Sequence, residues 1–169
     1  KKILPISVDY DFIETYIDEN LVPSKNAIFN TRPDRNINFL IDCWKTIKFY
    51  TGNSNLYINP PFNLDDIHIK LGIKLRTKGI KKDLINNLIN SKVMLNPGHK
   101  GEVFCLAAEE AKKLCVPIVT MGYGSLYERV DHGTTGFIAK NKKEFIDYSI
   151  NILNDDNLYL NLKKNLFLK

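Results

Sequence analysis

Residues 95–111 read Leu95-Asn96-Pro97-Gly98-His99-Lys100-Gly101-Glu102-Val103-Phe104-Cys105-Leu106-Ala107-Ala108-Glu109-Glu110-Ala111. The stretch passes from an apolar run through a glycine loop into a pattern of helical period. Gly98 and Gly101 allow the backbone to approach a ligand closely. The amides at the start of the helix have no partner within the helix, so they suit a diphosphate or a sugar oxygen. The stretch therefore predicts a strand, a turn and a helix around an anion site.

Apolar runs of strand length alternate with helical stretches on both sides of this segment. Such alternation is typical of an α/β fold, here a Rossmann-like parallel sheet of about six strands with helices on both faces. The predicted strands are 28–29, 56–58, 73–75, 93–95, 117–120 and 136–139, and the predicted helices are 37–50, 81–90, 104–115, 143–153 and 158–168. Ligands of these folds bind at the carboxyl ends of the strands, so the loops after the strands are the candidate site.

The composition fits one domain, because 169 residues that are 44% hydrophobic and 25% charged can bury one core. We expect a linker segment over residues 1–25 and the Rossmann-like domain over residues 26–169. The chain begins with Lys1 inside an apolar run, which indicates a piece of a longer protein. No apolar run approaches the roughly 20 residues that span a bilayer.

Charge and cysteine usage point to the cytoplasm and to anionic ligands. The 24 Lys and Arg against 19 Asp and Glu give a net charge of +5, which favours anionic ligands or lipid surfaces without requiring nucleic acid. Cys43, Cys105 and Cys115 form no C-x-x-C pair and sit in apolar helical patterns, where a thiol behaves as a small hydrophobe. A reducing compartment fits best.

Glu102 and Glu110 are the first candidate binding residues. Eight residues on a helix rise by roughly 12 Å, comparable to the length of a nucleotide sugar from hexose to ribose. A carboxylate accepts two hydroxyl hydrogen bonds from neighbouring sugar oxygens. The alternative is that Glu102 complements the helix dipole while Glu109 and Glu110 lie on a solvated flank. Helical angle does not choose between Glu109 and Glu110.

Several further motifs follow in order: Ala111 after the second glutamate, Val116-Pro117 before a strand, the pair Gly122 and Gly124, Glu128-Arg129-Val130, and Gly133-Thr134-Thr135-Gly136. Together with Glu102 and Glu110, this pattern resembles the C-terminal domain of family 4 glycosyltransferases. That resemblance implies one half of the two-domain GT-B fold. It covers about forty residues, and the order and spacing of its elements make it specific.

The resemblance implies roles for single residues. Glu102 would bind donor-sugar hydroxyls and act in catalysis, and Glu110 would bind ribose hydroxyls. The amides of the glycine loop and helix start would meet the sugar and the diphosphate; these belong to Gly101, Val103, Phe104, Cys105 and Leu106. Val103 and Cys105 depart from the family, where glycines are usual, and this predicts a narrower sugar pocket.

Arginines in two other loops complete the predicted site. In the loop after the first strand, Arg35 fits the family's lysine slot for the diphosphate, where its fork of donors suits phosphate oxygens, and it is the second candidate catalytic residue beside Glu102. Arg32 is the second candidate of that loop, although the family's other cation slot falls near Asn30. Arg76 follows the third strand, where the family places the nucleotide base, and a guanidinium can stack on a base. Each loop also has a plain reading as a solvated turn.

The resemblance implies a retaining glycosyltransferase that moves a sugar from a nucleotide-diphosphate donor to a glycan, lipid-linked or other acceptor. The acceptor would be held by the protein's own N-terminal domain, so the chain alone is expected to bind donor without turnover. No metal or other cofactor is expected; Asp9-Tyr10-Asp11 matches an Asp-x-Asp metal motif but reads as linker. Association with a membrane surface stays open, and no nucleic-acid partner is expected.

Two other readings of the sequence stay open. One is a non-catalytic α/β regulatory or nucleotide-binding module; a receiver-like version would need acidic residues after the first strand, where Asn30, Thr31 and Arg32 stand. The other is an epimerase or phosphorylase with the same two-domain fold. His99 lies beside Glu102 in the glycine loop, where it either contacts a ligand or is an ordinary surface histidine.

Overall fold

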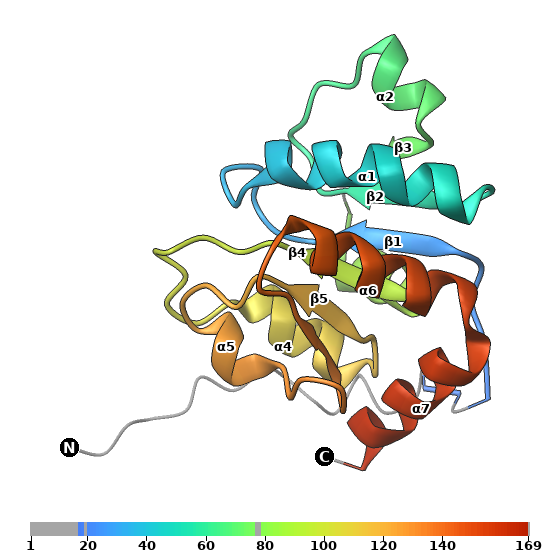
Figure 1. The fold of residues 1–169 in the computed structure, drawn as a ribbon, viewed down its shortest axis with the longest axis vertical. Coiled ribbons are helices and arrows are strands. Elements are labelled where there is room, and N and C mark those ends of the chain that lie inside the picture. The colour runs from blue at the N-terminus through green and yellow to red at the C-terminus, as the bar shows by residue number, and fades with distance from the viewer. Residues whose placement is uncertain (1–16, 19, 77–78, 169) are drawn as a thin grey trace.

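Strands and helices alternate along the chain as the sequence predicts (Figure 1). The computed structural model describes residues 17–18, 20–76 and 79–168. The strands within these residues are β1 (Asn26–Phe29), β2 (Asn55–Ile58), β3 (Ile73–Leu75), β4 (Val93–Asn96), β5 (Ile118–Thr120) and β6 (Gly136–Ile138). The helices are α1 (Ile37–Thr51), α2 (Asp66–Lys70), α3 (Lys81–Ile89), α4 (Leu106–Lys113), α5 (Leu126–Arg129), α6 (Lys142–Asn154) and α7 (Asp156–Phe167).

The six predicted strands and the five predicted helices are all present, and their ends differ by a few residues. The short helices α2 and α5 were not predicted, because five and four residues are too few to display a helical period. A side-chain cap holds α2: the carboxylate of Asp65 accepts the amide of His68 at 2.8 Å.

The sheet has the strand order β3-β2-β1-β4-β5-β6, and every neighbouring pair is parallel. The chain moves outward from β1 to β3, then returns to pair β4 with the other side of β1. The loops that leave β1 and β4 therefore diverge from neighbouring strands at the carboxyl edge of the sheet. Such a reversal of strand order opens a crevice for ligands in open α/β sheets.

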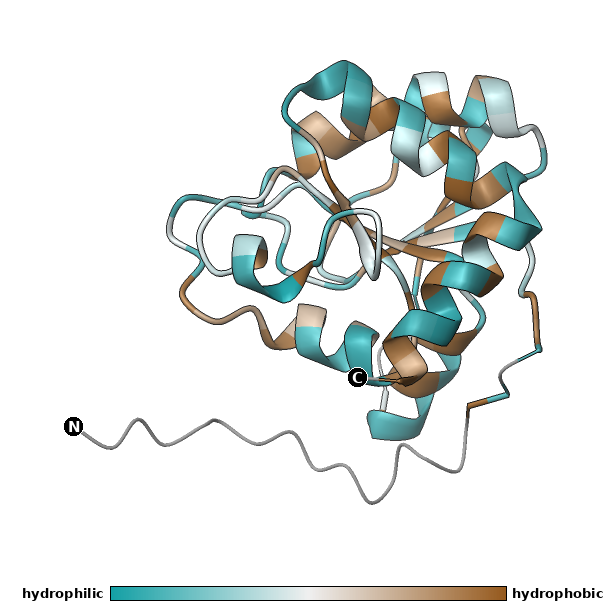
Figure 2. Ribbon diagram, turned by 60° about the horizontal axis from the view of Figure 1, so that its bottom comes forward, coloured by the Kyte–Doolittle hydropathy of each residue, from teal (hydrophilic) through white to brown (hydrophobic). Residues whose placement is uncertain are grey.

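Alternate residues of each strand bury against two separate helical layers. In β1, Ala27 and Phe29 face a core formed with α1, α6 and α7, and Ile28 faces a core formed with α3 and α4. Trp44 of α1 is fully buried in the first core. The helices turn their brown, apolar sides toward the sheet and their teal, polar sides outward (Figure 2). The predicted helices on both faces are thus confirmed.

Two buried lysines fix α7 to the rest of the domain. Lys92, just before β4, pairs with Asp156 and donates to the carbonyl of Leu153 at 3.1 Å. Lys163 donates to the carbonyl of Leu21 at 2.9 Å, so α7 also holds part of the predicted linker segment. Residues 1–16, including Asp9 and Asp11, lie outside the described residues.

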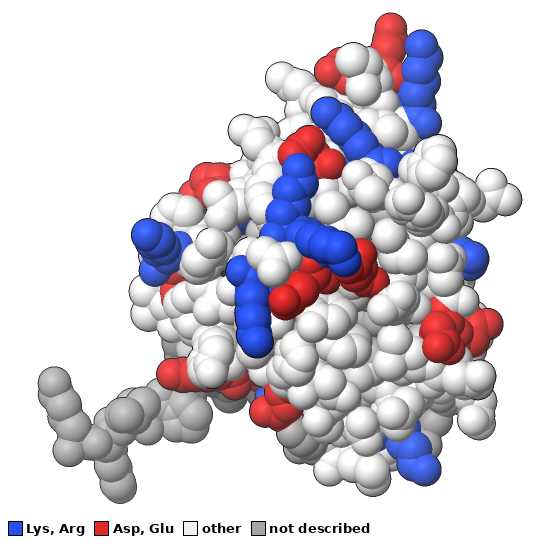
Figure 3. Space-filling model, viewed as in Figure 1, with Lys and Arg blue, Asp and Glu red and all other residues white. Residues whose placement is uncertain are grey.

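Positive and negative side chains intermingle on the face formed by α1 and α6 (Figure 3). Asp42 of α1 pairs there with Lys45, at 4.0 Å, and with Lys142 of α6. The net positive charge of the chain is therefore not gathered into one basic surface on this face. Among the described residues, the helices include none that is long and apolar enough to cross a lipid bilayer.

Candidate functional site

A crevice of about 410 Å³ opens at the carboxyl edge of the sheet, where the order of the strands reverses. It collects side chains from the loops after β1, β2, β3 and β4 and from the first turns of α3 and α4. The lining residues are Asn30, Thr31, Arg32, Asn59, Arg76, Leu84, Glu102, Cys105, Leu106, Ala107 and Glu110. Six residues of the predicted site are among them, although they come from three separate loops of the sequence.

Arg35 and Glu102 meet at one side of this crevice. Nε of Arg35 lies 3.5 Å from Oε2 of Glu102, and both side chains are largely buried, 16% and 10% exposed. Asn36, which follows Arg35, begins α1 in a left-handed conformation, and its side chain donates to the carbonyl of Gly98. That bond ties the loop after β1 to the loop after β4. The two predicted catalytic residues therefore form an ion pair across the strand reversal.

The backbone of Glu102 is held by the loop after β5, at Gly124 and Ser125. Ser125 donates its amide to the carbonyl of Glu102 at 2.9 Å. Gly124 has a φ of +59°, and a β-carbon there would stand 2.3 Å from that same carbonyl oxygen. A side chain at this position is excluded by both backbone strain and contact. Gly124 thus serves to bring the loop after β5 against Glu102.

The glycines of the anion loop differ from expectation. Gly98 has a φ of +83°, and its missing side chain makes room for Leu126 and Tyr123 of the protein itself. Gly101 has no positive φ, and a β-carbon there would meet only the ring of His99, at 3.3 Å. The close approach of Gly98 is therefore an internal packing contact, and the approach of a ligand to Gly101 stays a prediction.

Helix α4 begins at Leu106 and not at residue 104 as the sequence predicts, because Cys105 takes a left-handed conformation with φ 56°. Asn96, at the end of β4, donates to the sulfur of Cys105 at 3.4 Å and accepts the amide of Gly98 at 3.1 Å. Glu102 lies outside the helix, so the rise of a regular helix does not measure its separation from Glu110. The prediction that the rise of one regular helix sets the separation of Glu102 and Glu110 is therefore wrong, although both glutamates line the crevice.

In the described part of the chain, the backbone amides of residues 103–107 at this turn donate to no backbone carbonyl. Three of them precede the helix, so the predicted donor set combines a loop with the first turn of α4. Residues 105–107 line the crevice, and unpaired amides at a helix start suit an anion.

Glu109 and Glu110 differ in the side chains that surround them. Glu109 is buried, and its Oε1 lies 3.0 Å from Nη1 of Arg129, an ion pair whose angles do not make a regular hydrogen bond. Arg129 also donates to the carbonyl of Phe104 at 3.2 Å and lies 4.3 Å from the centre of that ring. We call these three residues the Arg129 cluster. Arg129 thus pairs with Glu109 and not with Glu128, which is exposed.

Glu110 lies on the crevice side of α4. Burial raises the pKa of its carboxyl, and the charges of Arg76 and Lys81 oppose that rise. Nδ2 of Asn30 donates to Oε2 of Glu110 at 3.4 Å. Burial likewise lowers the pKa of Arg76, against the opposing charges of Glu110 and Asp83. The two side chains therefore stabilise each other's charged forms in a partly dehydrated site.

The remaining predicted residues lie at the rim or behind the site. Arg32 lines the crevice but is 68% exposed and pairs with Asp34 at 3.4 Å. Val103 is 89% exposed, and Leu106 is half exposed at the mouth. Phe104 belongs to the Arg129 cluster. Burial raises the pKa of Cys105 to about 11, so this thiol is not a nucleophile at neutral pH.

Sequence reasoning missed two asparagines of the crevice. Asn59 accepts Nε of Arg76 at 2.9 Å and so orients the guanidinium. Asn59 directly follows β2. The rule that ligands bind at the carboxyl ends of strands would therefore have pointed to it. Asn30 is buried after β1, and its Oδ1 accepts no hydrogen bond in the described structure; neither does Oε2 of Glu102. The crevice wall thus carries buried acceptors that lack donors, a feature of sites completed by a ligand or by water.

His99 acts inside the loop. Its Nδ1 accepts the amide of Gly101 at 3.0 Å and lies 3.3 Å from Nη1 of Arg35. Both contacts require Nδ1 to be the unprotonated nitrogen, which assigns the proton to Nε2. The ring therefore contacts a different nitrogen of Arg35 from the one that approaches Glu102. No group of His, Cys, Asp and Glu suited to a metal occurs among residues 17–18, 20–76 and 79–168.

The sequence profile of the family described as "Glycosyl transferases group 1" matches residues 68–167, more than half of the chain. The chain belongs to this family. The match begins within α2, so it includes Glu102 and Glu110 but not the loop with Arg32 and Arg35. No curated protein matches the sequence.

Solved structures of GT-B glycosyltransferases share the fold of this group 1 domain. A mutant of S. aureus TarM, in complex with Fondaparinux, alpha-GlcNAc-glycerol and UDP, is similar with a TM-score of 0.70 and 16% identity over 96% of this chain. Pneumococcal O-GlcNAc transferase GtfA, in complex with UDP and GlcNAc, gives 0.70 and 15% over 86%. Anabaena HepE, in complex with UDP and glucose, gives 0.61 and 18% over 83%. The chain spans 35%, 32% and 41% of these proteins.

Proposed function

We propose that this chain is the donor-binding, C-terminal domain of a retaining family 4 glycosyltransferase, and that the crevice at the strand reversal binds a nucleotide-diphosphate sugar. One observation carries the proposal: the crevice joins arginines of two loops to two glutamates and to free amides of a third. Group 1 membership and the UDP held by the similar TarM, GtfA and HepE structures support the same ligand class.

Each part of the donor has a chemical counterpart in the crevice. Guanidinium groups and free amides suit a diphosphate, which offers acceptor oxygens and negative charge. The carboxylates of Glu102 and Glu110 and the amide oxygen of Asn30 are acceptors, and sugar hydroxyls are the donors that they need. Glu102 would bind the transferred sugar, and Glu110 the ribose. Arg76, held by Asn59, would lie against the base.

Transfer requires the diphosphate to leave as the anomeric bond breaks, with positive charge developing on the sugar. Arg35, assisted by Arg32 and by the amides near the start of α4, would stabilise the negative charge on the leaving group. His99 and Glu102 would hold Arg35 in place before the donor arrives, so little reorganisation is needed. This chemistry needs no metal ion.

The acceptor would come from a second domain of the same protein. Since the chain spans about a third of the TarM and GtfA structures, we expect the acceptor site and any proton-transferring residue to lie in an N-terminal domain. The acceptor would be a glycan or a lipid-linked molecule, with the enzyme cytoplasmic or at the membrane surface. Alone, the chain would bind donor without turnover.

Titration calorimetry with UDP-, GDP- and ADP-glucose tests the proposal. We expect one of these donors to bind the chain and to bind Arg35→Ala and Glu110→Ala at least about tenfold more weakly, because each variant loses a charged partner of the ligand. Asn157→Ala, on the exposed side of α7, is the control and should leave affinity unchanged. Equal affinity in all four proteins, or no binding of any donor, would contradict the proposal.

A further inference from the structure

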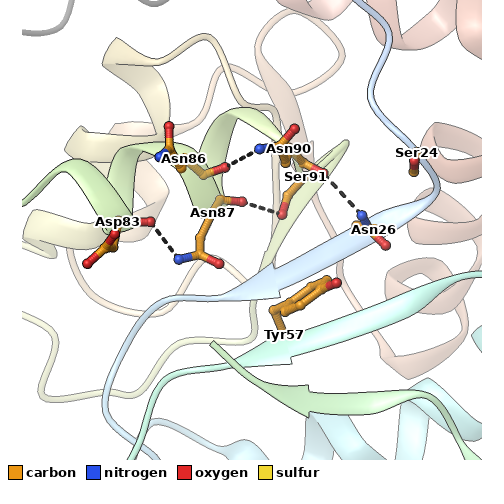
Figure 4. Close-up of a pocket in the computed structure, with 8 residues that line it drawn as sticks. All are labelled: Ser24, Asn26, Tyr57, Asp83, Asn86, Asn87, Asn90 and Ser91. Carbon is orange, nitrogen blue, oxygen red and sulfur yellow. Dashed lines mark hydrogen bonds between the residues drawn. The ribbon is translucent and has the colours of Figure 1, made fainter. Parts of the chain in front are cut away.

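A second cavity, of about 470 Å³, lies along the flank of α3. Its walls come from the start of β1, from β2 and from α3 with the residue pair that follows it, and they are formed by Ser24, Asn26, Tyr57, Asp83, Asn86, Asn87, Asn90 and Ser91 (Figure 4). We call this cavity the α3 trough. It begins one residue from the crevice, since Asp83 lines the trough and Leu84 lines the crevice, and it continues to the amino edge of the sheet.

The chemistry of the α3 trough is that of neutral amides and hydroxyls. Four of its eight lining residues are asparagines, and in this described set Asp83 alone carries a charge. With no arginine or lysine in the wall and one carboxylate at its end, the trough does not suit a phosphate. A single carboxylate also gives too few ligands for a metal. A neutral, strongly polar ligand is the class that remains.

The side-chain amides of Asn26, Asn87 and Asn90 are already oriented by internal bonds. Nδ2 of Asn90 donates to the carbonyl of Asn86 at 2.8 Å, and Nδ2 of Asn87 donates to that of Asp83 at 2.5 Å. Nδ2 of Asn26 donates to the carbonyl of Asn90 at 3.3 Å, which joins β1 to the end of α3 (Figure 4). These bonds orient the side-chain amides of Asn87 and Asn90 along α3 and that of Asn26 against the end of α3.

The acceptors of the same groups are left over. In the part of the chain that the structure describes, Oδ1 of Asn86, Asn87 and Asn90 receives no hydrogen bond. An amide oxygen has two acceptor positions, so the wall of the α3 trough presents several acceptors, and their own bonds hold those of Asn87 and Asn90 in place. Its ligand must therefore supply several donors without charge, and a run of hydroxyl groups does so.

Tyr57 adds an aromatic surface to the trough, which suits an apolar part of a ligand and not its hydroxyl groups. Its ring stands half-buried on the side of β2 that faces α3, with Nζ of Lys74 at 5.9 Å from the ring centre. An aromatic ring with a polar tip contacts a ligand that is apolar on one face and polar at its edge. A pyranose ring has C–H groups on its faces and hydroxyls around its edge.

We propose that the α3 trough is a binding site for a neutral saccharide, separate from the donor crevice, with Tyr57 against the face of a sugar ring and the asparagines of α3 accepting its hydroxyls. This juxtaposition of an aromatic ring and oriented amide acceptors is independent of whether the crevice binds a nucleotide. In a glycosyltransferase, a neutral saccharide belongs to the same class of molecule as the glycan that the reaction lengthens.

Side-chain amide signals of a ¹⁵N-labelled chain test this directly, because the asparagines carry them. We use cellotriose, maltotriose and tri-N-acetylchitotriose as neutral probes and tri-galacturonate as the charged control. At least one neutral probe should shift the amide signals of Asn86, Asn87 and Asn90, whereas tri-galacturonate should not, because Asp83 repels it. No shift at these residues with any neutral probe, up to the solubility limit of each, would overturn the proposal.

Two variants assign the binding to these residues. Tyr57→Leu and Asn86→Leu should each weaken binding of the responding saccharide by about fivefold, through loss of the ring contact and of one hydrogen bond. The control Asn157→Leu replaces an asparagine by leucine on the exposed side of α7. It should leave the affinity for the saccharide unchanged. Saccharide binding that survives both trough variants would also refute the site. Affinity for the nucleotide sugar should stay within twofold throughout, so failure at the trough and failure at the crevice are told apart.

Discussion

The two sides of α4 bear adjacent glutamates whose polar surroundings differ. Glu109 lies in the Arg129 cluster, where Arg129 contacts its carboxylate, the carbonyl of Phe104 and the ring of Phe104. Glu110 faces the crevice, where burial raises its pKa and Asn30 approaches it only at 3.4 Å. A carboxylate with a close internal cation stabilises the fold, and a half-buried one with weak partners is available to a ligand.

The matched pair Glu109→Ala and Glu110→Ala gives the largest expected difference. Glu109→Ala should lower the free energy of unfolding by about 2 kcal/mol, because Arg129 is left largely buried without its anion. Glu110→Ala should cost less than about 0.5 kcal/mol, since it removes an unfavourably buried charge along with a weak bond. Urea denaturation monitored by circular dichroism measures both. Similar losses in the two variants would refute the contrast between the two sides.

Arg129→Lys should have a smaller effect of about 1 kcal/mol on the unfolding free energy. A lysine keeps the charge but cannot contact Glu109 and the carbonyl of Phe104 at once with a planar fork. The same substitution at Arg35 should leave stability nearly unchanged and weaken donor binding. Thermal unfolding and calorimetry separate these results, and a stable Arg129→Lys with weak donor binding would reverse the assignment of the two arginines.

The pH dependence of stability sharpens the contrast at Glu110. Because its pKa is raised above the ordinary value of 4.5 in the folded chain, folding favours the protonated carboxyl. This contribution of Glu110 to the free energy of unfolding is present in full below pH 4.5. It is lost as the pH rises through the pKa that Glu110 has in the folded chain. Glu110→Gln does not titrate, so its stability relative to the parent chain should be greater at pH 7 than below pH 4.5. A difference in stability between the two proteins that is constant with pH would show that the pKa of Glu110 is not shifted.

Arg32→Ala gives the smallest expected effect on stability, below about 0.5 kcal/mol, since its pairing with Asp34 is exposed to solvent. Any loss of donor affinity in this variant should be weaker than in Arg35→Ala, because Arg35 is preorganised by Glu102 and His99. Calorimetry with the responding donor compares the two. A larger loss at Arg32 than at Arg35 would exchange their proposed roles.

The sequence predicts the sheet and its long helices because each carries a repeated apolar pattern. Leu40, Trp44 and Ile47 mark α1, for example, at spacings that only a helix brings to one side. The start of α4 was not predictable in this way, since Cys105 takes a left-handed conformation there that no apolar pattern indicates. Glycine is the residue that ordinarily marks such a position.

The crevice was predictable in outline and not in its pairings. The resemblance to family 4 glycosyltransferases selected Arg35, Arg76, Glu102 and Glu110, and the rule that ligands bind at strand ends agrees with the place of their loops. Helical spacing did not separate Glu109 from Glu110, because the difference depends on Arg129, which lies beyond β5 and reaches α4 only in the folded chain. Local patterns record which side of a helix is apolar, but not which distant side chain neutralises a charge on its flank.

The proposed site places a donor diphosphate at the carboxyl ends of β1 and β4. A crystal structure of the chain grown with UDP-glucose tests this directly. We expect the diphosphate within hydrogen-bonding distance of the guanidinium of Arg35 and of amides between residues 103 and 107, with the ribose at Glu110. Nucleotide density elsewhere on the domain, while this crevice holds only solvent, would contradict it.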